Sequence, residues 1–404
     1  MAEQQGAMRR DAAETAANRA WRHPGQVVAC WDGAVEPDPA MLRYQTSGAF
    51  WESVEAAGIT LLVTREYEHL LIAMSVTGGK PLVSYLTLPH PSGIAVDRRR
   101  RLVHVASTRN PNQIWDLAAV DDLLPRKDAG RTRVQVPTLM PMRSRVFPGS
   151  LYIHDLALVG ERLHANAVGH NSVIRISDDG FAYAWWPRCA ETAAGVAVQQ
   201  NYLQLNSIAA GASLRTSYFS ASTDRISRRR PGHVNFPVDG RGVVFSGATR
   251  EPIARGLTRP HSARLRNGQV WLLNSGYGQY GRVDDGAFHS VASLPGWTRG
   301  LCFHRDMAFA GTSRVLPRFR RYAPGLRLEQ AVCGVHAIDA RSGRVVGSLR
   351  WPRGNQIFAV EWIPARMARS LPFVMGASKP PLSLFYAYRP PGLKVTSSKW
   401  RSDK

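Results

Sequence analysis

Three histidines stand at the start of expected β-strands and form the most chemically distinctive set in this sequence: His90, His154 and His261. If these strand starts converge, three neutral imidazoles meet around one ion and leave a fourth position open for water or substrate. That ligand set suits zinc, iron or copper, and the open position gives a polarised water. We therefore predict a divalent transition-metal site, with Asp155 orienting one ligand. The alternative is that each histidine hydrogen-bonds to a neighbouring loop.

Glu361 and Arg299 are the residues expected to act in catalysis beside this ion. Glu361 lies on the last expected inner strand, where a lone carboxylate acts as a general base or binds the metal. It equally suits an ion pair with one of the many arginines. Arg299 and Asn206 open two further strands, and we expect them to contact an anionic group or another part of the substrate.

A second polar set lies at the ends of the strands that follow. Within it, Arg109 and Asn274 are predicted to contact the substrate from the opposite face. Asn and Ser at such positions also cap turns, which is the structural alternative for this set.

The segments that carry these residues repeat along the chain. Each has an apolar strand, a break, and a second strand that ends in small polar residues. The six returns start at His90, His154, Asn206, His261, Arg299 and Phe358. Strand units that recur every ~40–60 residues are typical of propellers. The sequence therefore predicts an all-β fold, a six-bladed β-propeller, in which the blade starts surround a central funnel.

The domain boundaries follow from where this pattern begins and ends. Residues 1–43 are polar and alanine-rich and predict an arm or short helix, residues 44–388 the propeller, and residues 389–404 a basic tail. Expected strands at 59–63, 70–76 and 82–88 precede the first return, so they should join a blade that the C-terminal strand completes. Residues 122–145 are polar, basic and proline-containing, and we interpret them as a long loop between blades.

The chain has an unusual excess of positive charge. It contains 52 Lys and Arg against 30 Asp and Glu, a formal net charge of +22. Such an excess attracts acidic proteins and other polyanions. Arginines cluster at residues 224–232 and 314–327, which together suggest a basic rim. The alternative is a well-solvated surface with tolerated insertions.

Several function classes lack their sequence signatures. The four cysteines are scattered without a CxxC pair, and no phosphate-binding glycine loop, nucleophile elbow or HExxH motif occurs. There is no run of eighteen apolar residues and no apolar N-terminal signal. We therefore expect a cytoplasmic protein with no membrane span.

Three motifs resemble those of a known family. They lie at residues 260–283 (PHSARLRNGQVWLLNSGYGQYGRV), 294–301 (LPGWTRGL) and 308–313 (AFAGTS). The sequence resembles, over roughly residues 44–375, an uncharacterised and mostly bacterial family of predicted β-propellers that carry a conserved domain of unknown function. The resemblance implies the propeller fold and brings no established activity. Family members tend to have a histidine two residues before Asn206, where this chain has Gln204.

Two functions are compatible with these patterns. The first is a metal-dependent enzyme with an axial site that acts on a small molecule or peptide in a biosynthetic pathway, by lyase, hydrolytic or oxidative chemistry. The second is a non-catalytic propeller that binds an acidic partner or polyanion through its arginine-rich rim. Substitution of His154 should abolish only the first function, and neutralisation of residues 228–230 only the second.

Overall fold

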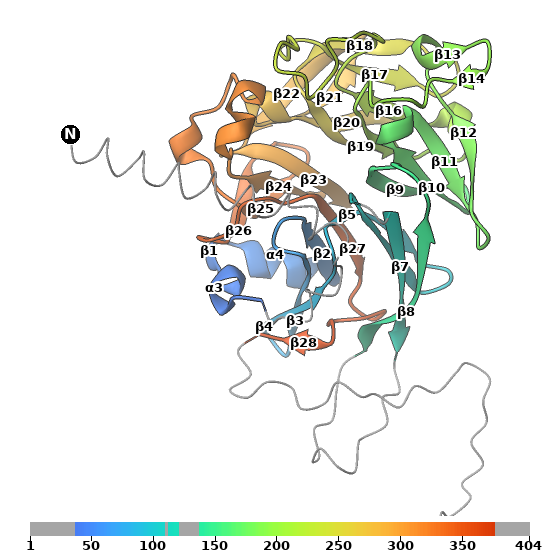
Figure 1. Cartoon of the computed structure of the whole chain (residues 1–404). Helices are drawn as coiled ribbons and strands as arrows, with labels where there is room; N and C mark the ends of the chain where they lie inside the picture. Colours follow the sequence, from blue (N-terminus) through green and yellow to red (C-terminus); the bar gives the residue numbers. More distant parts are fainter. Residues whose placement is uncertain (1–36, 110–111, 121–136, 376–404) are drawn as a thin grey trace, which may run out of the picture.

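Six antiparallel sheets stand in a ring around a central axis in the computed structural model of this protein (Figure 1). The structure describes residues 37–109, 112–120 and 137–375. The innermost strands contact one another in a closed circle, in the order β5, β9, β15, β19, β23, β27 and back to β5. The predicted six-bladed propeller is therefore confirmed.

Blades 1 to 3 each contain four strands, numbered from the axis outward. Blade 1 contains β5 (Pro91–Asp97), β6 (Leu102–Ser107), β7 (Asn112–Val120) and β8 (Thr138–Phe147). Blade 2 contains β9 (Ile153–Val159), β10 (Arg162–Ala167), β11 (Ser172–Ile176) and β12 (Phe181–Trp185). Blade 3 contains β15 (Leu205–Ala209), β16 (Tyr218–Ala221), β17 (Gly242–Ser246) and β18 (Pro252–Leu257).

Blade 4 has four strands, and blades 5 and 6 each have a fifth. Blade 4 contains β19 (Pro260–Arg266), β20 (Gln269–Asn274), β21 (Gln279–Asp284) and β22 (Ala287–Ser293). Blade 5 contains β23 (Trp297–His304), β24 (Met307–Ser313), β25 (Gly334–Asp339), β26 (Val345–Arg350) and β1 (Gln45–Gly48). Blade 6 contains β27 (Ala359–Pro364), β2 (Ile59–Arg65), β3 (Leu70–Thr77), β4 (Lys80–Thr87) and β28 (Phe373–Val374).

Short elements connect or cover these blades. Among the described residues, the α-helices are α3 (Pro39–Leu42) and α4 (Phe50–Ala57), and α4 packs against strands of blades 5 and 6. The 3-10 turns are η2 (Val168–His170), η3 (Arg188–Ala190), η4 (Leu214–Thr216), η5 (Ser275–Tyr277), η6 (Pro317–Tyr322) and η7 (Leu328–Gln330). A small hairpin joins β13 (Glu191–Thr192) to β14 (Gly195–Val196). No helix within the described ranges is long and apolar enough to cross a membrane.

The ring is closed by strands from both ends of the described chain. β27 pairs with β2 on the axial side of blade 6, and β28 pairs with β4 on its outer side. The prediction that a C-terminal strand completes the first three strands is thus confirmed. This closure joins distant parts of the sequence, so it stabilises the ring as one cooperative unit.

The prediction of a loop at residues 122–145 is wrong for the second half of that segment. Residues 138–147 form β8, the outermost strand of blade 1, and residues 121–136 lie outside the described residues. An outermost strand faces solvent, so its middle is polar and exposed, and it tolerates Pro141 at an edge. Those features hid the strand in the sequence. The predicted tail at residues 389–404 and most of the predicted arm at 1–43 also lie outside the described residues.

Side chains at the third position of β9, β15 and β19 join neighbouring blades. Asp155 accepts a hydrogen bond from the Ile208 amide, Ser207 from the Ala263 amide, and Ser262 from the Gly300 amide. Each bond satisfies a buried amide of the next blade, which would otherwise cost about 1–3 kcal/mol. The inner strands are therefore fixed relative to one another at the level where the axial side chains begin.

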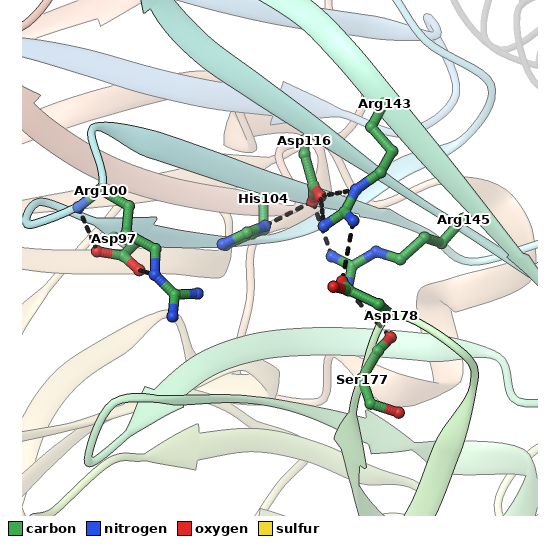
Figure 2. A network of polar contacts seen from close by, with 8 residues as sticks. All are labelled: Asp97, Arg100, His104, Asp116, Arg143, Arg145, Ser177 and Asp178. Atoms are coloured by element: carbon green, nitrogen blue, oxygen red, sulfur yellow. Dashed lines mark hydrogen bonds and ion pairs between the residues drawn. The ribbon is translucent and has the colours of Figure 1, made fainter. Parts of the chain in front are cut away.

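A polar network around the buried Asp116 ties blade 1 to blade 2 farther from the axis (Figure 2). The Asp116 carboxylate lies 2.6 Å from His104 Nδ1. It also forms ion pairs with Arg143 and Arg145, each at 2.8 Å. Arg143 also reaches Asp178 in blade 2 at 2.9 Å. Burial alone would raise the pKa of Asp116, but hydrogen bonds from His104 and Arg143 lower it to about 2. The carboxylate is thus ionised and holds the outer strands together.

Buried histidines should make this fold sensitive to acid. His336 lies between Thr312 and Ser348 at 2.9 and 2.8 Å, and burial, followed by Arg350, lowers its pKa to about 3. An unfolded histidine binds a proton near pH ~6.5. His336 therefore contributes stability above that pH, and the contribution is lost as the pH falls below it.

His336→Gln should remove this dependence while it keeps a hydrogen-bonding side chain. The free energy of unfolding can be measured with urea at pH 7 and at pH 5. Its decrease between the two pH values should be about 2 kcal/mol smaller for the variant than for the unmodified protein, because unfolding of the variant takes up one proton fewer. His289→Gln, at an exposed position, is the matched control and should change the loss little. Equal losses for all three proteins would contradict the assignment.

Candidate functional site

The starts of the inner strands surround a pocket on the propeller axis. Its free space is about 600 Å³, open mouth included. The pocket is lined by Glu66, Tyr152, His154, Gln204, Arg259, His261, Trp297, Arg299, Ser313, Arg314, Val315, Leu316, Phe319, Gln356 and Phe358. The predicted axial funnel is therefore present, and it combines aromatic walls with arginine and histidine side chains.

The residue that precedes the inner strand adopts a left-handed backbone conformation in four blades. The φ values are 43° for His90, 53° for Tyr152, 52° for Gln204 and 54° for Arg259. Each such residue costs about 1–3 kcal/mol and persists only where the surroundings fix it. Tyr152, Gln204 and Arg259 all line the pocket. The strained turns thus aim side chains at the axis.

Two arginines of the pocket are buried without an acidic partner among the described residues. Arg299 lies over Phe358, with its guanidinium carbon 3.3 Å from the ring centroid, and its Nη2 contacts His154 Nδ1 at 3.3 Å. Arg259 lies over Tyr322 at 4.3 Å and donates to Ser222 Oγ at 3.2 Å, while its Nε has no partner. Burial lowers the pKa of Arg299 to about 10 and also lowers that of Arg259. Both remain charged at neutral pH.

Glu66 is the carboxylate that lines the pocket, and it belongs mainly to a different arginine. Its Oε1 accepts from Thr108 Oγ1 at 2.5 Å and lies 3.7 Å from Arg109 Nη2. Burial raises its pKa, but Arg109 and His90 lower it further, so the net shift is downward. The charge of Glu66 also acts on Arg299 and opposes the fall in its pKa. One carboxylate therefore faces Arg109, Arg259 and Arg299, and the pocket keeps a net positive charge.

The hydrogen bonds of the two pocket histidines assign opposite tautomers. Arg299 is only a donor, so His154 Nδ1 must accept and its proton stands on Nε2. Ser275 donates its single hydroxyl proton to the Thr298 carbonyl oxygen at 2.6 Å. Ser275 Oγ must therefore accept from His261 Nδ1–H, 2.8 Å away, which leaves Nε2 of the neutral His261 ring unprotonated.

Both rings are neutral at physiological pH. Burial, followed by the charge of Arg299, holds the pKa of His154 and of His261 well below the usual 6.5. The pocket thus holds one neutral imidazole that can donate through Nε2 and one that can accept through Nε2. Such a pair suits proton transfer to and from a bound molecule.

The residues predicted to hold a metal are not brought together as one set. His154 and His261 line the pocket, but His90 does not, and its ring packs edge-on against His69 with 4.4 Å between centroids. Within the described parts of the chain, no three His, Cys, Asp or Glu side chains are grouped in a way that would hold a metal ion. A guanidinium beside His154 also disfavours a cation there. These residues do not fit the predicted centre, and a metal requirement stays a prediction.

Sequence comparison then places the protein in a family. The family model described as a domain of unknown function, DUF4915, matches residues 48–371. The chain belongs to the DUF4915 family. The resemblance expected from the motifs is thereby confirmed. None of the functionally curated proteins is similar enough in sequence to count as a relative.

Solved structures similar to this DUF4915 protein share its fold at low sequence identity. A chain from the nidogen/laminin complex has a TM-score of 0.50 at 9% identity, covering 75% of this chain and 98% of that chain. A gluconolactonase from Xanthomonas campestris has a TM-score of 0.43 at 15% identity (69% and 82% covered). The β-propeller domain of Cps50 (Swd1) from Myceliophteria thermophila has a TM-score of 0.39 at 12% identity (74% and 89% covered). These likenesses concern the fold alone.

The other predicted site residues of this DUF4915 protein are placed at varying distances from the pocket. Arg299 lines it, and Arg109 stands beside it with its guanidinium 5.6 Å from the Tyr152 ring. Asn206 is buried behind the lining and donates to the Pro260 carbonyl at 2.9 Å. Asn274 accepts from the Thr258 amide and donates to Gln279, so it organises a turn.

Glu361 and Asp155 lie outside the pocket lining. Glu361 accepts from the amide of the next residue and is 3.9 Å from Arg98, and burial raises its pKa although Arg264 opposes the rise. Asp155 pairs with Arg264 at 3.0 Å rather than with a histidine. Asp155 also accepts a hydrogen bond from the Ile208 amide of the next blade, and the charges of Arg264 and Asp155 both act on Glu361.

The sequence analysis missed several lining residues, foremost Glu66, Tyr152 and Arg259. Register explains two of them, because Tyr152 and Arg259 directly precede inner strands, as His90 does. The position of blade 1 that corresponds to His154 and His261 is Ser92, the second residue of β5. Comparison of the residue two places before each return would have found Tyr152 and Arg259. Nothing in the local sequence marks Glu66.

Proposed function

We propose that the axial pocket is the active site of an enzyme that acts on a small molecule with an anionic group. The observation that carries this proposal is the pair of buried arginines, Arg259 and Arg299, without acidic partners in the described chain. A buried, unpaired charge is costly to keep, and a carboxylate, phosphate or sulfate of a ligand would compensate it. Guanidinium groups suit these planar or tetrahedral anions.

The aromatic walls support a substrate with an apolar body. Trp297, Phe319 and Phe358 line the same pocket as the arginines. Aromatic faces contribute most of the contact energy in such sites, and a few polar groups fix the orientation. We therefore propose a substrate in which one anionic group is attached to a flat or apolar portion.

The two neutral histidines provide the acid–base chemistry for hydrolysis. In the proposed step, His261 Nε2 takes a proton from water while the oxygen of that water attacks an electrophilic carbonyl carbon. His154 Nε2–H and the Arg299 guanidinium stabilise the resulting oxyanion. When the intermediate collapses, the carbonyl re-forms, and the leaving oxygen takes the proton from His261.

Charged and neutral probe pairs test this function. In calorimetric titrations, phenyl phosphate should bind at least tenfold more tightly than phenol, and benzoate more tightly than benzyl alcohol, because each pair differs mainly in charge. The anionic ester 4-nitrophenyl hemisuccinate should be hydrolysed faster than neutral 4-nitrophenyl butyrate. Equal affinity within both probe pairs would overturn the proposed anion site.

Metal dependence is a separate proposal that rests on the sequence. It assigns zinc, iron or copper to His90, His154 and His261. Elemental analysis of protein purified without an affinity tag, compared with the His154→Ala/His261→Ala double variant, tests it. Near-stoichiometric metal that is lost in the double variant would support it, whereas metal-free protein after reconstitution would exclude it.

A further inference from the structure

Two insertions form a roof over one side of the axial pocket. The roof consists of residues 224–241, between β16 and β17, and residues 314–331, between β24 and β25. Phe236 and Val238 of the first insertion pack with Val315 and Tyr322 of the second and with Trp297. Arg321 donates to the carbonyls of Gly232 and Val234. The roof is therefore a packed, preorganised surface beside the pocket mouth.

The roof is strongly basic by sequence. Its two segments contain ten arginines against three acidic residues, Asp224, Asp239 and Glu329. Two of these acids are already used, because Asp224 pairs with Arg255 at 2.8 Å and Asp239 accepts from Thr258 and Tyr277. Arg225, Arg228 and Arg229 are exposed on the first segment. Such a patch attracts an acidic surface and steers its approach.

The same segment exposes apolar side chains between its arginines. Val234 is 73% exposed and Ile226 is 39% exposed. Exposed apolar groups ringed by charge are typical of protein interaction sites. Proteins that bind single-stranded nucleic acid instead present aromatic faces for stacking. Here the aromatic Phe236, Tyr322 and Trp297 are packed inside the roof.

We propose that the roof docks an acidic, partly apolar protein segment, such as an amphipathic helix rich in Asp and Glu. The arginines pair with its carboxylates, and Ile226 and Val234 contact its apolar face. The docked partner stands beside the pocket mouth, where it presents or receives the small anionic substrate. Only this last point rests on the proposed function; the docking surface stands on the roof alone.

A labelled 20-residue peptide of Glu and Leu with helical spacing tests this surface with the full-length protein. Fluorescence anisotropy should show binding that weakens steeply as salt rises. Arg225→Glu/Arg228→Glu/Arg229→Glu should weaken it at least tenfold, and Val234→Ser about threefold. Arg230 is left unchanged because it bonds to Gln200 and Asn201, and Asn201 in turn contacts Gln204 in the pocket lining.

The matched control reverses three exposed arginines elsewhere, Arg162, Arg175 and Arg215, which line a groove between blades 2 and 3. That control should change peptide affinity less than twofold. Absence of peptide binding in 50 mM salt, an equal loss in the control, or tighter binding of a 20-nucleotide oligo(dT) would overturn the docking proposal. Phenyl phosphate affinity, measured in parallel, should persist in the roof variant, so failure of the pocket proposal is seen separately.

Discussion

His261→Ala should lower the turnover of 4-nitrophenyl hemisuccinate by about 10²–10⁴-fold, the usual contribution of a general base. Its Nε2 is unprotonated because Nδ1 donates to Ser275. The other candidate bases are engaged, since His154 Nδ1 contacts Arg299 and the Glu66 carboxylate contacts Thr108 and Arg109. Affinity for phenyl phosphate should change little, since the arginines that bind the anion remain. Added imidazole should restore part of the rate in the variant, an effect that a purely structural role would not give.

The pH dependence of the same reaction gives an independent readout. Burial, followed by Arg299 and Arg259, holds the pKa of His261 well below 6.5. The basic, neutral form therefore persists as the pH falls from 8 to 6.5, and activity should decline only below that range. His289→Ala, at an exposed position, is the control and should keep the full rate. A His261→Ala variant within threefold of the unmodified rate would exclude His261 as the base.

Arg299→Met should weaken phenyl phosphate binding by about 10- to 100-fold, because a charge-assisted hydrogen bond contributes about 1.5–3 kcal/mol. Stability should change little. The variant loses the stacking of Arg299 on Phe358 but also removes a buried charge that has no acidic partner in the described chain. Loss of affinity without loss of stability is the signature of a binding residue that the fold itself does not need.

Arg98→Met is the matched control for this substitution. Arg98 also stacks on an aromatic ring, that of Trp362 at 4.1 Å, but it lies outside the pocket lining. This control should leave phenyl phosphate affinity unchanged. Arg299→Met should also move the acidic limb of the pH–rate profile upward, since the Arg299 charge lowers the pKa of both pocket histidines. Unchanged affinity in Arg299→Met would contradict the anion site.

The arginines of the roof and those of the pocket differ in burial, so salt should affect them differently. Arg259 and Arg299 are buried and act at short range, where a bound anion must replace lost hydration. Arg225, Arg228 and Arg229 of the roof are exposed and act through solvent, so salt should weaken their effect. Assays over a salt series therefore distinguish the two, because only roof binding should fall steeply with salt.

The repeat itself determined the fold. Six returns of one strand pattern correspond to the six inner strands, because burial on both faces makes each of them a nearly continuous apolar run. Closure of the ring could also be expected from the strands at 59–88, which needed a partner from the other end of the chain. The outermost strand β8 escaped prediction because a solvent-facing edge carries no strong apolar pattern.

The composition of the pocket was decided by the tertiary structure. Five inner strands pair with the next strand of their blade through a register shift near the second and third residues. In β19 the shift lies between His261 and Arg264. A bulge there breaks simple alternation and re-aims side chains, so spacing along the sequence does not reveal which ones reach the axis. His154 and His261 are the second residues of their strands and line the pocket. His90 stands before the first residue of β5, and its ring packs against His69.

The partners of the charged groups also depended on the tertiary structure. Sequence alone identified Arg299 and Glu361 as candidates, but it could not show that Glu361 lies near Arg98 while Arg299 has no acidic partner in the described chain. Nor could it bring Glu66, from blade 6, to the axis beside Arg109 of blade 1. Such pairings join residues that are far apart along the chain, so only the closed ring determines which charges are balanced and which remain for a ligand.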